Sequence, residues 1–405
     1  MIRTLYLSYD GLTDPLGQSQ VLPYLLKLSE DKEIHIISCE KPINFKHYKK
    51  DIYALIKGKR IYWHPLTYHK YPPIFSTIWD LWRIKNLATD LNKTLNFQLV
   101  HCRSHLMAIL GDYLKRSIGV PYVFDMRSFF PEERVDGNLW PQKKLIFKLI
   151  FNYFKSKEVK MFESSDQIVV LTDAAKKILS LNYNEDKISV IPCCADFDLF
   201  NFKSVSRESI NMAKDDLKLN DNHFILSYLG SVGTWYELDN MLEFFARVKL
   251  KKPNAVFVFF TPSEPNIILS KLEKYGIKNE DIRIRFIDRI DLPRYLLVSS
   301  ISIFFIKNTF SKKASSPTKH AELMGLGIPV ISNFGVGDLD VIINTTKTGQ
   351  LIDMNEVTSI DKVINSMDDL VAIDRDYIRK RGKEIYSLTK GSLSYDGIYS
   401  NIINK

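Results

Sequence analysis

Residues 316–330 read Ser-Pro-Thr-Lys-His-Ala-Glu-Leu-Met-Gly-Leu-Gly-Ile-Pro-Val, an order of residue types that predicts a helix followed by a strand. Ser316 is a good N-cap and Pro317 suits the first helical position, so a helix is predicted to begin here. The two glycines of the run are predicted to end it, and residues 328–332 read as a buried strand. The start of such a helix leaves backbone N–H groups and the positive dipole end available to a phosphate.

The polar side chains of this predicted helix suit a nucleoside diphosphate. Lys319 adds a full positive charge near the helix start. Glu322 lies one turn on, on the same face as Lys319 and Thr318, where its carboxylate could accept hydrogen bonds from both hydroxyls of a ribose. With Ser316, these residues form a predicted nucleotide site. The same spacing also fits an ordinary helix–strand turn in which Glu322 and Lys319 are solvated.

Short β-branched runs alternate with helical stretches almost throughout the chain, which is typical of an α/β protein with parallel sheets. The 405 residues, 45% of them hydrophobic, suffice for two domains with packed cores. The polar, irregular stretch 193–207 is the predicted linker. Doubly wound sheets would place ligands at the carboxyl ends of their strands. The predicted strands are 4–8, 34–38, 99–102, 122–125, 167–171 and 189–192 in the first half, and 224–230, 255–261, 284–287, 301–306 and 328–332 in the second.

Residues 316–330, with the glycine loop Asn-Phe-Gly-Val-Gly-Asp at 333–338, resemble the nucleotide-sugar segment of the retaining glycosyltransferases of family 4, which have the GT-B architecture. The likeness covers most of the chain. It implies two Rossmann-like, doubly wound domains: an acceptor-side domain over residues 1–200 and a donor-side domain over 208–384, with 385–405 crossing back to the first. It also implies that Glu322 holds the ribose of a nucleoside diphosphate sugar.

The loop after the predicted strand 224–230 departs from this family. It contains Gly230, Ser231 and Gly233, and glycines between a strand and a helix let the backbone approach a phosphate, so these three residues are predicted to bind the donor. A plain strand-to-helix turn is the alternative. Family members commonly carry an Arg directly after the first glycine and a Lys five residues later. This chain has Ser231 and Tyr236 there instead.

A second departure concerns the donor sugar. The family has a pair of glutamates eight positions apart, and Ala314 stands eight positions before Glu322. Either another group binds the donor sugar, or the donor site has a different geometry in the subset of the family with Ser or Ala at this position. Lys319 is then expected to neutralise the negative charge of the diphosphate, and Lys307, Lys312 and Lys313 are further candidates.

Two features of the N-terminal half are candidates for substrate contacts. Gly17 lies in a turn-rich segment after the first predicted strand, where backbone N–H groups could approach donor or acceptor, although a bare turn needs no ligand. The resemblance favours a donor contact. His105 follows the predicted strand 99–102 and could hydrogen-bond a sugar or a leaving group, or could be a packed bystander.

Residues 125–134, Asp-Met-Arg-Ser-Phe-Phe-Pro-Glu-Glu-Arg, carry more charge than a loop after a strand requires. Charged groups that a strand delivers to a cleft are site candidates, and a structural ion-pair cluster is the alternative. The run resembles the acceptor-side loop of the same family subset, which implies that Arg127 binds an acceptor pyrophosphate and that Asp125 or Glu133 orients or deprotonates the acceptor hydroxyl. His105, Asp125, Arg127 and Glu133 are therefore the candidate catalytic residues, with the base left open.

Composition and motif spacing narrow the classes of function. Four scattered cysteines fit neither a disulfide framework nor a CxxC metal site. Asp338-Leu339-Asp340 spells the DxD of another glycosyltransferase architecture, but it lies in a glycine loop after a different strand, so no metal or other cofactor is expected. The net charge of +9 favours anionic partners. No recognition helix, finger or stacking motif is visible, so no nucleic-acid partner is predicted.

A cytoplasmic location is expected, because no apolar run approaches the roughly 20 residues that cross a bilayer and the first residues do not read as a signal peptide. Residues 140–160 interleave lysines with large apolar side chains. Such a helix either lies peripherally at the anionic inner face of a membrane or is a core helix with a lysine-bearing outer face.

The sequence therefore predicts a hexosyltransferase-type enzyme that moves a sugar from a nucleoside diphosphate sugar to a saccharide or lipid-linked saccharide in cell-surface polysaccharide biosynthesis. Retention of stereochemistry follows from the family resemblance alone. Two alternatives stay open. One is a non-catalytic nucleotide-sugar-binding partner subunit, which Ala314 and the absent Arg/Lys pair favour. The other is a nucleotide-sugar epimerase on the same architecture.

Overall fold

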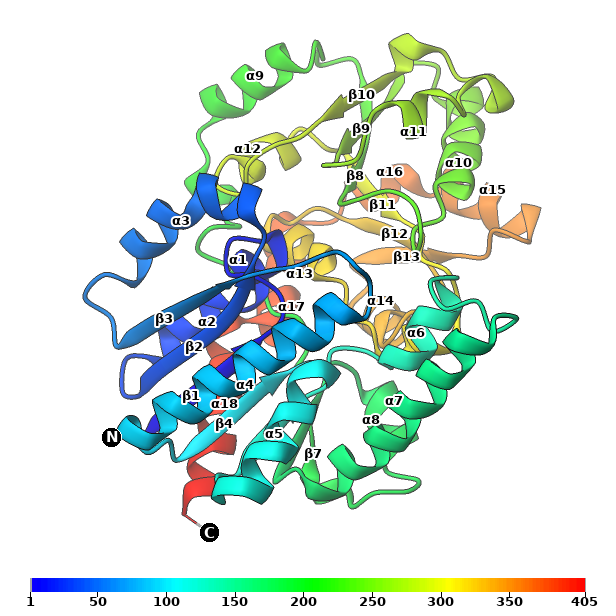
Figure 1. Cartoon of the computed structure of the whole chain (residues 1–405). Helices are drawn as coiled ribbons and strands as arrows, with labels where there is room; N and C mark the ends of the chain where they lie inside the picture. Colours follow the sequence, from blue (N-terminus) through cyan, green and yellow to red (C-terminus); the bar gives the residue numbers. More distant parts are fainter. Residues whose placement is uncertain (1, 405) are drawn as a thin grey trace. The chain divides into compact units, whose positions relative to one another are not determined.

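The computed structural model describes residues 2–404, which form two compact units (Figure 1). Unit 1 comprises the chain up to Pro192 together with the residues from Leu388 onward, and unit 2 comprises Cys193–Ser387. The predicted linker, residues 193–207, belongs to unit 2. Phe197 and Phe200 are buried there, and Arg379 donates hydrogen bonds of 2.6 Å to the carbonyl oxygens of both.

Unit 1 is built on a seven-stranded parallel sheet in the order β3-β2-β1-β4-β5-β6-β7. Chain order reverses between β1 and β4, which makes their carboxyl ends the expected ligand position. Continuous apolar runs form the central strands because both faces of a parallel sheet are covered. The strands are β1 (Arg3–Ser8), β2 (Glu33–Glu40), β3 (Ile61–Thr67), β4 (Leu99–Arg103), β5 (Tyr122–Asp125), β6 (Gln167–Val170) and β7 (Ile188–Val190).

Helices cover both faces of this sheet, and α4, α5 and α7 lie beside one another on one of them (Figure 1). The close approach of α5 to the sheet depends on Gly111, where a Cβ would lie 2.5 Å from Cys102 Sγ and 2.7 Å from the Tyr122 ring. Helix α18 packs against α2 and β4. The helices of unit 1 are α1 (Pro15–Gln20), α2 (Leu22–Leu28), α3 (Pro42–Ile56), α4 (Phe75–Leu95), α5 (His105–Ile118), α6 (Phe130–Asp136), α7 (Leu145–Ser164), α8 (Asp173–Leu179) and α18 (Leu388–Ile403), with a 3-10 turn at Glu185–Lys187.

Unit 2 repeats the plan with six parallel strands in the order β10-β9-β8-β11-β12-β13. Here chain order reverses between β8 and β11. Strands β9 and β11 are buried along their whole lengths, and β8, which lies between them, is nearly so. The strands are β8 (Phe224–Leu229), β9 (Ala255–Phe260), β10 (Ile282–Arg285), β11 (Ile301–Phe304), β12 (Val330–Asn333) and β13 (Gly349–Ile352).

The helices of unit 2 bury their apolar faces against this sheet and against each other, as α10 does with Met241, Leu242 and Phe245. Helix α13 packs against α17. The helices are α9 (Arg207–Asp216), α10 (Leu238–Lys251), α11 (Asn266–Leu269), α12 (Leu292–Leu296), α13 (Thr318–Gly325), α14 (Leu339–Thr346), α15 (Val357–Asn365), α16 (Met367–Val371) and α17 (Arg375–Tyr386), with 3-10 turns at Phe202–Ser204, Glu273–Tyr275, Asn279–Asp281 and Phe310–Ala314.

The predicted α/β class with two doubly wound parallel sheets is confirmed. Each predicted strand overlaps a strand of the structure, with ends that shift by a few residues. The two strands that the sequence did not predict, β3 and β13, lie at sheet edges. Edge strands bury fewer side chains, so their apolar signal is weaker.

Candidate functional site

Helix α13 begins one residue later than predicted. Pro317 is its N-cap and Thr318 its first residue. The prediction that Ser316 caps the helix is wrong, because the Ser316 hydroxyl accepts a hydrogen bond of 3.1 Å from the backbone N–H of Cys193 instead. The extended Pro317 conformation, with ψ of 113°, still turns the chain into the helix. The first N–H groups of α13 therefore remain as donors for a ligand.

Lys319 places a buried ammonium group among aromatic rings. Its Nζ lies 3.8 Å from the centroid of the Tyr236 ring and 4.4 Å from that of Tyr228, and donates a hydrogen bond of 3.3 Å to the Tyr228 hydroxyl. Ring faces attract the cation, but they replace its hydration only in part. Burial holds the pKa of Lys319 well below its usual value, and Glu322 opposes this shift. The site therefore favours an anion beside Lys319.

The glycine loop after β8 is shaped around this ammonium group. A Cβ at Gly230 would lie 2.9 Å from Lys319 Nζ, and the φ of Gly230 is +121°. Gly233 also has a positive φ, +95°, but no atom lies within 4 Å of its Cβ position. Ser231 is exposed, and its carbonyl oxygen accepts a hydrogen bond of 2.6 Å from Tyr228. Lys319 is thus held at the carboxyl end of β8, beside the reversal of strand order.

Glu322 is buried in the same helix and has a partner that the sequence did not reveal. Its Oε1 accepts a hydrogen bond of 2.6 Å from Arg289, whose guanidinium lies over the Phe200 ring at 5.0 Å. Arg289 comes from the loop between β10 and α12, 33 residues earlier in the chain. No local pattern marks this arginine, so only the tertiary structure identifies it. The ion pair fixes the orientation of the Glu322 carboxylate.

The loop after β12 is held by its own side chains. Asn333 accepts a hydrogen bond from the N–H of Ile306 and donates one to its carbonyl oxygen, both 2.7 Å long. Asp340 accepts from the N–H of Gly335 at 3.0 and 3.1 Å. In the DxD motif, the Asp340 carboxylate, a possible cation ligand, therefore fixes the loop instead. Within residues 2–404, no three His, Cys, Asp or Glu side chains group as a metal site.

In unit 1, Asp125 is the centre of a buried charged network at the carboxyl ends of β4 and β5. Arg127 donates to its two oxygens at 3.2 and 3.4 Å, and His101 Nε2 lies 3.4 Å from it. Burial by itself raises the pKa of Asp125, but Arg127, His101 and Arg103 hold it well below its usual range. A carboxylate held ionised in this way is a weak proton acceptor, so Asp125 suits a positioning role better than that of a base.

His105 lies in a different cluster. It is the first residue of α5, is buried against Phe130 in a stacked contact, and its Nε2 is 2.8 Å from Glu158 Oε1. Lys155 joins Glu158 to Glu132 of α6. Glu133 is the next residue of α6 and is half-buried. The structure thus brings Asp125 and Arg127 together, and places His105 among side chains that join α5, α6 and α7.

Gly17 is buried where α1 meets the preceding loop. A Cβ there would lie 2.0 Å from the Gly11 carbonyl oxygen, so only glycine fits. The loop itself is fixed by Glu40, whose carboxylate accepts hydrogen bonds from the N–H groups of Leu12, at 2.7 Å, and Thr13, at 3.1 Å. Glu40, 27 residues from Thr13, is a loop-fixing residue that the sequence did not reveal.

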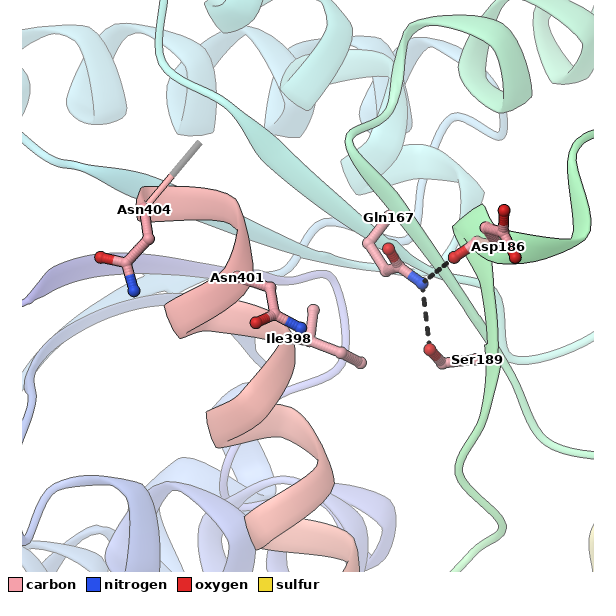
Figure 2. Close-up of a pocket in the computed structure, with 6 residues that line it drawn as sticks. All are labelled: Gln167, Asp186, Ser189, Ile398, Asn401 and Asn404. Atoms are coloured by element: carbon pink, nitrogen blue, oxygen red, sulfur yellow. Dashed lines mark hydrogen bonds between the residues drawn. The ribbon is translucent and has the colours of Figure 1, made fainter.

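A pocket of ≈ 410 Å³ lies elsewhere in unit 1, between the start of β6, β7 and the end of α18 (Figure 2). In Figure 2, Gln167 donates to the Asp186 carbonyl oxygen at 3.4 Å and to Ser189 at 3.0 Å, and Asn401 lies nearby on α18. Because Gln167 is the first residue of β6, this pocket lies at the amino ends of the strands. It is therefore at the edge of the sheet opposite to Asp125.

Two family models match the chain. The model of Glycosyltransferase Family 4 matches residues 28–199, and the model of Glycosyl transferases group 1 matches residues 209–384. No curated protein matches the chain. No helix within residues 2–404 is long and apolar enough to span a bilayer.

Solved structures share the fold over nearly the whole chain at low identity. Sucrose-phosphate synthase from Thermosynechococcus elongatus has a TM-score of 0.74 at 15% identity and covers 100% of both chains. HepE from Anabaena, solved with UDP and glucose, has a TM-score of 0.73 at 10% identity, over 99% of this chain and 100% of that one. WaaG, a glycosyltransferase involved in lipopolysaccharide biosynthesis, has a TM-score of 0.67 at 11% identity, over 97% and 98%.

Proposed function

By its two family models and its fold the chain is a GT-B glycosyltransferase, and we propose that it transfers a sugar from a nucleoside diphosphate sugar bound on unit 2 to an acceptor hydroxyl. The observation that carries this proposal is the Lys319 ammonium, which is buried at the start of α13, one turn before Glu322, and forms no salt bridge with a carboxylate of residues 2–404. A buried cation that is not paired is costly, and a diphosphate would supply its counter-charge.

In the proposed reaction, the bond between C1 of the donor sugar and the diphosphate oxygen breaks. Its electron pair stays on that oxygen, while the acceptor oxygen bonds to C1 and gives its proton to the departing diphosphate oxygen. Lys319 and the first N–H groups of α13 stabilise the charge that develops on the diphosphate. They take the role of the Arg and Lys that this chain replaces with Ser231 and Tyr236. No metal or other cofactor is needed in this proposal.

The donor ribose is proposed to bind Glu322. Arg289 engages Oε1, and the other carboxylate oxygen is then oriented to accept from the ribose hydroxyls. HepE was solved with UDP and glucose, which supports a nucleoside diphosphate hexose as the class of donor. The expected retention of configuration rests on the resemblance to family 4.

We further propose a saccharide or lipid-linked saccharide acceptor in cell-surface polysaccharide biosynthesis, which the likeness to WaaG supports. The surface of unit 1 fits a peripheral place at an anionic inner membrane. In the first half of α7, Leu145, Ile146 and Leu149 are 71%, 52% and 57% exposed, beside the exposed Lys144 and Lys148. Apolar side chains that insert and lysines that meet lipid phosphates characterise such helices.

Helix α4 adds a second apolar surface on the same face of unit 1. Phe75, Ile78, Trp79 and Trp82 are each about half exposed or more, and the two tryptophan rings stack at 4.9 Å. Crossover helices of a parallel sheet run opposite to the strands, so the starts of α4 and α7 lie at the edge where the strands end. This is the edge that carries Asp125.

Turnover of a panel of UDP-, GDP- and ADP-sugars without acceptor tests the proposed function. We expect slow release of nucleoside diphosphate from one donor, persisting in EDTA, and a loss of about 10-fold or more for Lys319→Met. Lys251→Met, which removes an exposed lysine of α10, should behave as wild type. Conversion of the donor to an epimeric sugar would support the epimerase instead, and tight binding with no turnover would support the non-catalytic subunit.

A further inference from the structure

The carboxyl edge of the unit 1 sheet gathers two arginines at the point where strand order reverses. In register across the sheet, Ser8 of β1 pairs with Arg103 of β4, and Arg103 pairs with Asp125 of β5. Arg127 follows β5 by two residues. Ligands bind doubly wound sheets at this position, because the loops on either side of the reversal diverge and leave room above the strand ends.

The hydrogen-bonding capacity of Arg103 is largely unused. Its side chain is only 5% exposed, yet Nε lies 4.0 Å from Asp10 and Nη1 lies 3.7 Å from Asp125, which are too long for hydrogen bonds. Within residues 2–404, neither Nε nor Nη1 has a hydrogen-bond partner. Buried donors are nearly always satisfied, and an orphaned charged donor costs more than a neutral one. A purely structural arginine would be expected to find partners.

The negative charges around Arg103 also do not balance its positive charge. Asp125 is one carboxylate shared between Arg103 and Arg127, and Asp10 is about half exposed and more distant. Burial raises the pKa of Tyr6 to about 12 and lowers the pKa of His101, so neither ring is charged near neutral pH. Within residues 2–404, the buried Arg103 guanidinium thus has no carboxylate at hydrogen-bond distance, and an oxyanion would supply its counter-charge.

We propose that Arg103 and Arg127 form a subsite for an oxyanion, a phosphate or a carboxylate, carried by the sugar acceptor. This inference rests on the proposed function, because it assigns the acceptor to unit 1. The anion accepts hydrogen bonds from the free nitrogens of Arg103 and from Arg127, while Asp125 keeps both guanidinium groups in place. The acceptor is then an acidic saccharide or a saccharide phosphate rather than a neutral sugar.

Calorimetric titration with inorganic pyrophosphate tests the subsite. The wild type is expected to bind it at two sites, of which Lys319→Met weakens one and Arg103→Gln or Arg127→Gln weakens the other, by about 10-fold or more. Arg116→Gln removes the same charge from the exposed end of α5 and should leave both sites intact. Pyrophosphate binding that is unchanged in Arg103→Gln and Arg127→Gln, or a single site that Lys319→Met alone removes, would overturn the proposal.

Three further measurements complete the test. Circular dichroism identifies a variant that fails to fold, in which case Arg103→Lys, which keeps the charge but loses the guanidinium, takes its place and is expected to weaken the site by a smaller factor. Displacement of pyrophosphate by glucose 1-phosphate or by methyl glucuronate separates a phosphate-bearing from a carboxylate-bearing acceptor. Nucleoside diphosphate affinity, measured on the same variants, shows separately whether the donor proposal holds.

Discussion

At the scale of single residues, Lys319 is the proposed cation of the donor site, because its ammonium is buried among aromatic rings and forms no salt bridge with a carboxylate within residues 2–404. Tyr228 and Tyr236 stabilise the cation through their ring faces, and Tyr228 also accepts one hydrogen bond from it. The family's usual lysine is replaced by Tyr236, and the side chain at that position now packs against the lysine that α13 supplies. The departure from the family pattern therefore relocates the positive charge rather than removing it.

This environment predicts proton uptake when the diphosphate binds. Burial holds the pKa of Lys319 low in the free protein, and a bound anion raises it toward its usual value. Between the free and bound pKa values, binding takes up a proton, so affinity is highest below the free value and falls as pH rises through this window. Within this window, the calorimetric enthalpy of diphosphate binding should depend on the ionisation enthalpy of the buffer.

Lys319→Met provides the control for this measurement, since it should bind more weakly and with the same enthalpy in every buffer. An enthalpy for the wild type that is equal in HEPES and Tris buffers would show that Lys319 keeps one protonation state throughout.

At the scale of elements, the β8–α10 loop and the start of α13 depend on each other. Gly230 leaves the space that Lys319 Nζ occupies, so Gly230→Ala is expected to displace the lysine and to strain a backbone with positive φ. Gly276→Ala is the matched control, because it introduces similar backbone strain of about 1–2 kcal/mol with open space around the new methyl group.

Thermal unfolding and nucleotide affinity separate the two effects. Both variants should lose stability by a similar amount, but only Gly230→Ala should also lose affinity by about 10-fold. Equal affinities in the two variants would mean that the contact between Gly230 and Lys319 has no role in binding.

The strands and helices also show which parts of the fold can be predicted from the sequence. Strand β9 (Ala-Val-Phe-Val-Phe-Phe) was predictable because both of its faces are buried. Strand β3 was not, since it carries His64 and Pro65 and exposes half of Tyr62 at the sheet edge. The helix start was misplaced by one residue because the Ser316 hydroxyl accepts a hydrogen bond from Cys193, a contact across 123 residues that no local cap rule anticipates.

At the scale of the whole molecule, each unit carries its candidate site at the same topological point, the carboxyl ends of the strands where chain order reverses. The sequence predicted Lys319, Glu322, Asp125 and Arg127 because each follows or precedes a strand in a local pattern. The roles of Arg289 and Glu40 could not be predicted, because their partners lie 27 or more residues away in the sequence. The unsatisfied nitrogens of Arg103 could not be predicted either, because they depend on the burial that the fold imposes.

The proposed attachment to a membrane is tested on unit 1 as a whole. Wild-type protein is expected to sediment with vesicles that contain anionic phosphatidylglycerol and to remain in solution with neutral phosphatidylcholine vesicles. Trp79→Ser together with Trp82→Ser should reduce binding by removing apolar insertion, and Lys144→Gln with Lys148→Gln by removing charge. Binding that is insensitive to both pairs would rule out α4 and α7 as the docking surface.

The central claim is that α13 binds a nucleoside diphosphate sugar and that Glu322 binds its ribose. The most direct test compares the affinities of the wild type and of Glu322→Gln for a ribonucleoside diphosphate and for its 2′,3′-dideoxy analogue. Hydrogen bonds to a charged group are worth about 1.5–3 kcal/mol, so the wild type should prefer the ribonucleotide by about 10-fold or more. Glu322→Gln should lose most of this preference while binding the dideoxy analogue nearly as well as the wild type does. A preference that is the same in both proteins would contradict the account.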